Sequence, residues 1–226
     1  MRLIFLLSFS LLMAAAEPGY ETRTINGWQV LIEDSFAKAN DETLAKVVAE
    51  LTSQLHGIVR MVPAPALEKI RAVPIWVNRK SGTACMAFHP SAEWLSGHGF
   101  NPHMANSVEI GNAENFISWT RQQPWMVLHE LAHAYHFRQF GYQYPPILNA
   151  WQNAKQSGTY DSVLHIQGKV QKHYALNNQM EYFAELSESY FGTNDFFPFV
   201  RPELKKHDPT GFEVIERAWG VQQAAK

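Results

Sequence analysis

Residues 127–136 read Val-Leu-His-Glu-Leu-Ala-His-Ala-Tyr-His, and the rest of the chain is organised around this stretch. Its apolar residues are typical of a buried helix. On a helix, His129 and His133 point the same way, one turn apart, so both rings can bind one metal ion about 2 Å away. Glu130 lies beside them, where it can accept a proton from an attacking water. The pattern His-Glu-x-x-His therefore predicts one zinc ion on the two histidines. The alternative is a chance occurrence of the pattern in an ordinary core helix.

A second helical stretch, residues 177–192, reads Asn-Asn-Gln-Met-Glu-Tyr-Phe-Ala-Glu-Leu-Ser-Glu-Ser-Tyr-Phe-Gly. An asparagine can cap its start and Gly192 can end it. Glu181 and Glu185 lie on one face among aromatic residues, where an unpaired carboxylate costs several kcal/mol. We therefore expect Glu181 to be the third zinc ligand. Glu185 is expected to accept the outer N–H of a ligating histidine. Both could instead be solvated or salt-bridged surface carboxylates.

Together these two stretches resemble the gluzincin arrangement, and the Glu-Tyr-Phe-Ala-Glu run at 181–185 resembles the anthrax lethal factor catalytic-domain family. That family carries a catalytic tyrosine seven residues before the ligating glutamate and an asparagine three before it. Tyr174 and Asn178 stand at those positions. The resemblance covers the two motif helices and the turn before the second, about a third of the chain. The metzincin pattern does not fit, because its glycine and histidine positions hold His136 and Gln139.

The resemblance implies an α+β, zincin-like fold with a small mixed sheet over the active-site helix and a mainly helical C-terminal half. It implies a secreted zinc metallopeptidase that acts on a peptide or protein. Glu130 would be its general base and Tyr174 the donor to the oxyanion or leaving group. Tyr174 could instead be a packed core tyrosine. In that case Tyr160, His165 or His173 would be the candidate electrophile. There are two alternative functions: a binding protein without catalytic turnover, and a zinc hydrolase that acts on a non-peptide amide.

The first sixteen residues predict a secretory signal peptide, with a charged start, a short apolar core and small residues before Glu17. A membrane anchor is the alternative, although the apolar core is short for one. Residues 17–226 then form one domain, secreted or periplasmic. Hydrophobic residues make up 46%, the net charge is −2, and no basic run is longer than Lys205-Lys206, so we expect no nucleic-acid partner. The lone Cys85 is expected to be a small buried group, with an intermolecular bridge or an inhibitory metal contact as alternatives.

Several further elements follow from local patterns. Alternation around Asn26-Gly27 predicts a hairpin over 23–32. Periodicity predicts a helix behind 40–42 that reaches residue 58, and Pro63 and Pro65 then break the chain. The remaining expected elements are strands at 73–77 and 107–111, the zinc helix from near Pro124 to Gly141, a short helix at 147–155, a hairpin or loop at 158–168, and a final helix at 208–220.

Residues 80–105 are expected to be a loop that carries His89, His98 and His103. Three histidines invite a second metal site, but their spacings match no compact ligand pattern and favour solvated side chains. In zincin-like folds the strand just before the zinc helix forms the edge of the sheet over the cleft. The resemblance therefore implies that residues 107–111 form an edge that can pair with an extended peptide.

Overall fold

A computed structural model describes residues 17–39 and 42–221. The predicted signal peptide and the predicted start of the first long helix at 40–41 lie outside these residues. The architecture is α+β with a small mixed sheet, as expected. None of the described helices combines the length and the apolar character that crossing a bilayer requires.

The N-terminal half holds a five-stranded sheet in the order β1-β2-β3-β5-β4. Its strands are β1 (Tyr20–Ile25), β2 (Trp28–Glu33), β3 (Ile75–Val77), β4 (Met86–His89) and β5 (Ser107–Ile110). The outer pairs β1/β2 and β4/β5 are antiparallel, whereas β2/β3 and β3/β5 are parallel. The predicted hairpin is confirmed: Asn26 and Gly27 both have positive φ and join β1 to β2.

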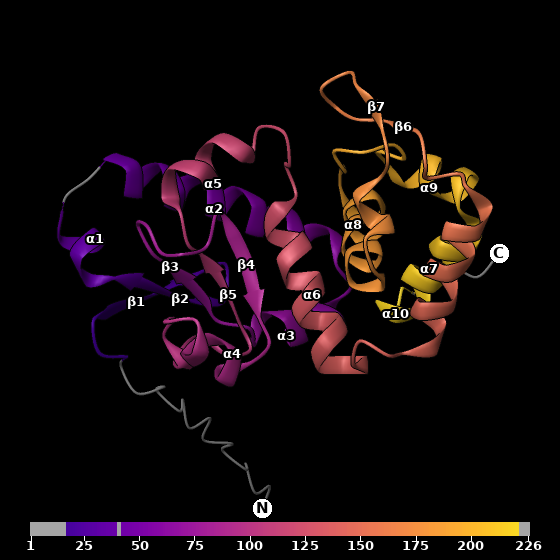
Figure 1. The fold of residues 1–226 in the computed structure, drawn as a ribbon. Coiled ribbons are helices and arrows are strands. Elements are labelled where there is room, and N and C mark those ends of the chain that lie inside the picture. The colour runs from indigo at the N-terminus through magenta and orange to yellow at the C-terminus, as the bar shows by residue number, and fades with distance from the viewer. Residues whose placement is uncertain (1–16, 40–41, 222–226) are drawn as a thin grey trace, which may run out of the picture.

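Helices cover both faces of the sheet, with α2 and α5 on one side and α4 on the other (Figure 1). These N-terminal helices are α1 (Asp34–Lys38), α2 (Glu42–Met61), α3 (Ala64–Arg71), α4 (Ala92–Gly97), the short η1 (Pro102–Met104) and α5 (Ala113–Trp119). Pro63 and Pro65 follow the end of α2 at Met61, as expected, but the sequence did not predict the helix that begins there. Pro63 is the N-cap of α3 and Pro65 lies in its first turn, where a proline costs no hydrogen bond.

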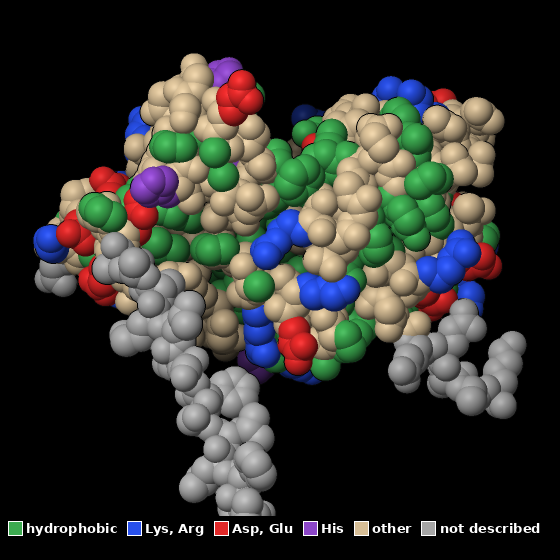
Figure 2. Space-filling model, turned by 90° about the horizontal axis from the view of Figure 1, so that it is seen from below, with side chains coloured by type: hydrophobic (Ala, Val, Ile, Leu, Met, Phe, Trp, Pro, Cys, Tyr) green, Lys and Arg blue, Asp and Glu red, His purple; other side chains and the backbone are tan. Residues whose placement is uncertain are grey.

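The C-terminal half is mainly helical, and α6 (Met126–Phe140) lies between it and the sheet (Figure 1). Beyond α6 come α7 (Pro145–Ser157), the small hairpin β6 (Val163–Leu164) and β7 (Val170–Gln171), η2 (Tyr174–Leu176), α8 (Gln179–Phe191), α9 (Arg201–His207) and α10 (Pro209–Ala218). One buried apolar cluster runs from the sheet through α6 into α8 and α10. On the face drawn in Figure 2, charged side chains lie in small mixed groups among hydrophobic and other residues.

Two expectations for the region before α6 were wrong. Residues 80–105 are not only loop, because they contain β4, α4 and η1. The strand at 107–111 is β5, which is interior to the sheet, and β4 is the edge. The edge strand β4 is also the one that packs along α6, and it runs antiparallel to its neighbour.

A candidate metal centre between two helices

His129 and His133 belong to α6, which is held in place by its buried side chains and by contacts at both of its ends. Val127, Leu128 and Leu131 are fully buried. At the start of the helix, the backbone N–H of Val127 donates to Gln54 Oε1 of α2 at 3.0 Å, which satisfies one of the free amides of the first turn. Gly141, with φ of 72°, ends the helix as predicted. The rotation of α6 is therefore set by packing and by a long-range cap.

The glutamate helix α8 starts at its predicted cap. Asn178 Oδ1 accepts from the backbone N–H groups of Met180 and Glu181, both at 2.9 Å. This cap fixes the backbone of Glu181 directly. At the other end, Gly192 lies so close to Trp125 that an added Cβ would be 1.9 Å from the indole. Trp125 immediately precedes α6, so this contact joins the start of α6 to the end of α8.

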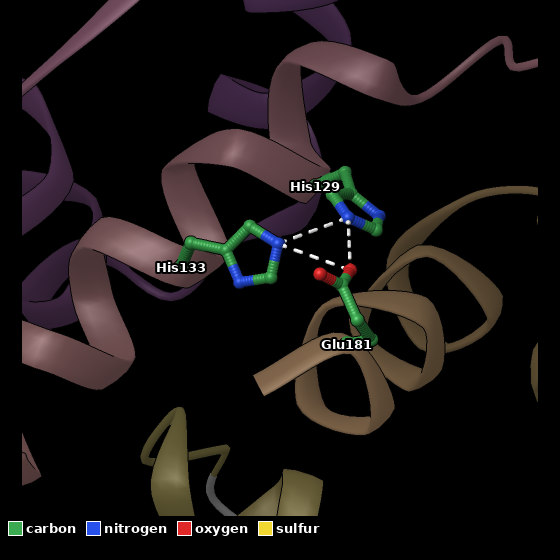
Figure 3. Close-up of side chains that lie close together, drawn as sticks. All are labelled: His129, His133 and Glu181. Carbon is green, nitrogen blue, oxygen red and sulfur yellow. Dashed lines mark hydrogen bonds and ion pairs between the residues drawn. The ribbon is translucent and has the colours of Figure 1, made fainter. Parts of the chain in front are cut away.

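Three atoms that could bind a metal ion meet where the two helices face each other (Figure 3). The Nε2 atoms of His129 and His133 are 3.1 Å apart, and Glu181 Oε2 lies 3.1 Å from the first and 3.3 Å from the second. Around a tetrahedral zinc with bonds near 2.1 Å, neighbouring ligand atoms are about 3.4 Å apart. The three side chains that were predicted as ligands are therefore brought together at nearly the separation that such an ion requires.

The outer nitrogen of His129 faces two buried carboxylates, and the closer one is Glu188. Its Oε1 is 2.7 Å from His129 Nδ1, whereas Glu185 Oε1 is 3.6 Å away. The expectation that Glu185 accepts this N–H was wrong, because Glu185 is held instead by Asn194, whose Nδ2 donates to its Oε2 at 2.9 Å. A proton on Nδ1 leaves the Nε2 lone pair of the neutral ring directed at His133 and Glu181. This is the tautomer that a metal ligand needs.

Glu181, Glu185 and Glu188 surround His129, and burial and mutual contacts shift the pKa values of these groups. Burial lowers the pKa of His129, but hydrogen bonds to Glu181 and Glu188 outweigh it and hold the pKa well above its usual value. Burial raises the pKa of Glu188 to about 7, and burial together with the nearby Glu188 raises that of Glu185 well above its ordinary range. Burial also opposes ionisation of Glu181, yet the two histidines hold its pKa below the usual value. A bound cation would relieve this excess of carboxylates.

Glu130 is held by the edge strand. Its Oε2 accepts from the backbone N–H of Phe88 in β4 at 2.8 Å. Glu130 and His129 also line one pocket of about 350 Å³. One carboxylate oxygen is thus fixed by the strand beside the ligand set.

Tyr174 lines the same pocket and is 47% exposed, so it is not a packed core tyrosine. It begins η2, whose N-cap His173 accepts at Nδ1 from the backbone N–H of Ala175 at 3.1 Å. Burial, followed by the nearby Glu181, raises the Tyr174 pKa, which keeps its hydroxyl protonated. Of the alternative electrophiles, Tyr160 and His173 are buried away from solvent, and only His165 lines the pocket.

Cys85 also lines the pocket and is buried, which argues against an intermolecular bridge. Burial and the nearby Glu130 raise its thiol pKa to about 12. The three histidines of residues 80–105 each have a different partner. His89 pairs with Glu109 at 2.8 Å, His98 hydrogen-bonds the backbone of its own helix, and His103 pairs with Glu17. Within the described ranges, the groups that could hold a metal are His129/His133/Glu181 and His129/Glu185/Glu188.

Sequence reasoning missed three neighbours of the site. Glu188 is seven residues after Glu181 and so lies on the same helix face, which extending the stripe by one turn would have found. Asp195 follows α8 in an irregular segment, and no local pattern places it in the pocket. Tyr142 follows α6, and its ring centroid lies 5.3 Å from that of His136. Burial, followed by the nearby Glu130 and Glu181, raises its pKa.

Comparison of the chain with protein-family models, with curated proteins and with solved structures gave no match.

Proposed function

We propose that the chain is a zincin-like, zinc-dependent hydrolase of the gluzincin type, and that it cleaves peptide bonds. The observation that carries this proposal is the convergence of His129 Nε2, His133 Nε2 and Glu181 Oε2 within 3.1–3.3 Å of one another. The donor set fits zinc: two imidazoles, of which His129 is held in a suitable tautomer by Glu188, and one carboxylate make three ligands and leave a fourth position open. When bound, zinc would supply Lewis acidity, which polarises a carbonyl and acidifies water.

The protein's own residues would supply the general base and the hydrogen-bond donor for the reaction. Glu130, fixed by the Phe88 N–H, would take the proton of the attacking water. Tyr174 would donate a hydrogen bond where negative charge develops on the carbonyl oxygen. The edge strand β4 runs beside Glu130, so an extended peptide can pair with its free side. This edge is what favours a peptide over a smaller amide as the substrate. We also propose that the protein is exported, on the basis of residues 1–16.

The experiment is cleavage of a diverse peptide library by the zinc-loaded protein without residues 1–16, read by mass spectrometry. The matched variants are Glu130→Gln, which keeps the shape of the side chain, and Glu68→Gln, an exposed position on α3. We expect Glu130→Gln to keep its zinc and lose nearly all cleavage, because an amide cannot accept the proton. Glu68→Gln should match the unmodified protein. Wild-type turnover in Glu130→Gln would exclude the mechanism, and zinc binding without any cleavage would indicate a binding protein.

A further inference from the structure

The pocket beside the candidate metal centre has two chemically different walls. One wall is apolar and is built from β4, α5, α6 and the segment after α8. Its members are Cys85, Met86, Trp119, Met126 and Phe196. The second wall is acidic: besides Glu130, the pocket is lined by Glu185, Glu188 and Asp195, each 3–4% exposed. No lysine or arginine of residues 17–39 and 42–221 lines this pocket.

The carboxylates are only partly satisfied by the protein. Glu188 Oε2 is buried and has no hydrogen-bond partner among the described residues, although its side chain lines the pocket. Asp195 Oδ2 has two distant neighbours, His165 Nε2 at 3.4 Å and Gln123 Nε2 at 3.5 Å. An unpaired carboxylate oxygen at such depth is costly unless a cation or a donor reaches it.

The rim of the pocket suits a long side chain. Trp119 is 43% exposed there, a large aromatic surface left open to solvent. An indole can pack along an aliphatic stem and attract a cation over its face. The guest that matches both walls is therefore a flexible apolar chain that ends in a positive charge.

We propose that this pocket is the specificity pocket of the enzyme, and that it takes the side chain of a lysine or arginine next to the scissile bond. This inference rests on the proposed peptidase function. The cationic end reaches the carboxylate wall near Asp195, and the stem lies along Trp119 and Met126. The site then cleaves selectively beside basic residues.

The test uses four peptides, acetylated and amidated at their ends, that carry lysine, arginine, norleucine or glutamate at one central position. Norleucine keeps a lysine-like stem without the charge. A fifth peptide has the composition of the lysine peptide with that lysine moved to one end, which controls for net charge. Relative kcat/KM is measured with the zinc-loaded protein, and peptide affinity is measured with its Glu130→Gln variant.

We expect the lysine and arginine peptides to exceed the norleucine peptide by about tenfold to a hundredfold in both measurements, the range for a hydrogen bond to a charged group. Asp195→Asn should reduce this ratio most of the way to one. The matched control Asp161→Asn, an exposed aspartate, should leave the ratio unchanged. The comparison of peptides on the unmodified protein stands even if Asp195→Asn does not fold.

Two failures are distinguishable. A basic preference in binding that Asp195→Asn removes, without cleavage of any peptide, would support the pocket and refute the peptidase. Cleavage of all peptides at equal rates would support the peptidase and overturn the pocket. A second zinc equivalent that displaces the lysine peptide would assign the carboxylates to a metal and would also overturn it.

Discussion

His129 Nδ1 and Glu188 Oε1 are 2.7 Å apart, in a contact that is closed to solvent on the Glu188 side. The two residues come from different helices, α6 and α8, so the orientation of the His129 ring depends on how these helices pack. The outer hydrogen bond of a ligating histidine fixes the ring and raises its basicity. In the proposed metal site, this contact would give Glu188, rather than Glu185, the role of tuning the His129 ring.

The first prediction compares these two carboxylates. We expect Glu188→Gln to weaken zinc binding by about tenfold or more, since an outer hydrogen-bond partner of a ligating histidine is worth that much. Glu185→Gln should weaken it less, because Glu185 is 3.6 Å from the ring and is held by Asn194. Competition with a chromophoric chelator measures both. A larger loss of zinc affinity in Glu185→Gln than in Glu188→Gln would contradict this prediction and would assign the tuning role to Glu185.

The second prediction concerns the contact between Gly192 and Trp125. We expect Gly192→Ala to destabilise the protein by about 1–3 kcal/mol, because the new methyl group would overlap the indole. The φ of Gly192 is −151°, so the requirement is for space and not for a left-handed backbone. Denaturant unfolding measures the loss. In a Trp125→Phe background the same substitution should cost less, and an equal cost in both backgrounds would contradict this explanation.

The third prediction is an acid-dependent loss of stability at His173. Burial, followed by the nearby His207, lowers its pKa to about 3, against about 6.5 in an unfolded chain. Below pH 6.5, His173 therefore binds fewer protons in the folded state than in the unfolded state. The stability contributed by the neutral ring is complete above that pH and falls as the pH drops towards 3, by up to about 5 kcal/mol. Protonation would also place a hydrogen on Nδ1, which accepts the Ala175 N–H.

His173→Asn keeps an acceptor for that N–H and removes the titration. Its free energy of unfolding should depend less steeply on pH between 6.5 and 4 than that of the unmodified protein. His56→Asn, at an exposed position on α2, is the matched control. Urea unfolding across this pH range gives the slopes, and parallel slopes for His173→Asn and the unmodified protein would refute the assignment.

The parts of the fold that could be predicted are those whose signal is local. Asn26-Gly27 needs only its own turn geometry, and the four-residue spacing of His129 and His133 is enough to place both on one face of α6. The other parts of the fold and of the site depend on contacts between residues far apart in the sequence. The four residues of β4 carry no distinctive pattern, and only their pairing with β5 makes them the edge beside Glu130. The choice between Glu185 and Glu188 depends in the same way on a tertiary contact.

The last prediction concerns the oxyanion donor. Tyr174 lies in the pocket with Glu130 and is 47% exposed, so Tyr174→Phe should change the melting temperature little. If its hydroxyl meets the developing charge, the substitution should lower kcat about a hundredfold and leave KM and zinc content near normal, since such a donor acts mainly in the transition state. Tyr142 is the rival, because Glu130 and Glu181 both influence its ring and it follows the ligand helix directly. Tyr142→Phe is therefore the paired variant in steady-state kinetics. A normal kcat in Tyr174→Phe with a hundredfold loss in Tyr142→Phe would transfer the role to Tyr142, and the family resemblance around Tyr174 would then not extend to its chemistry.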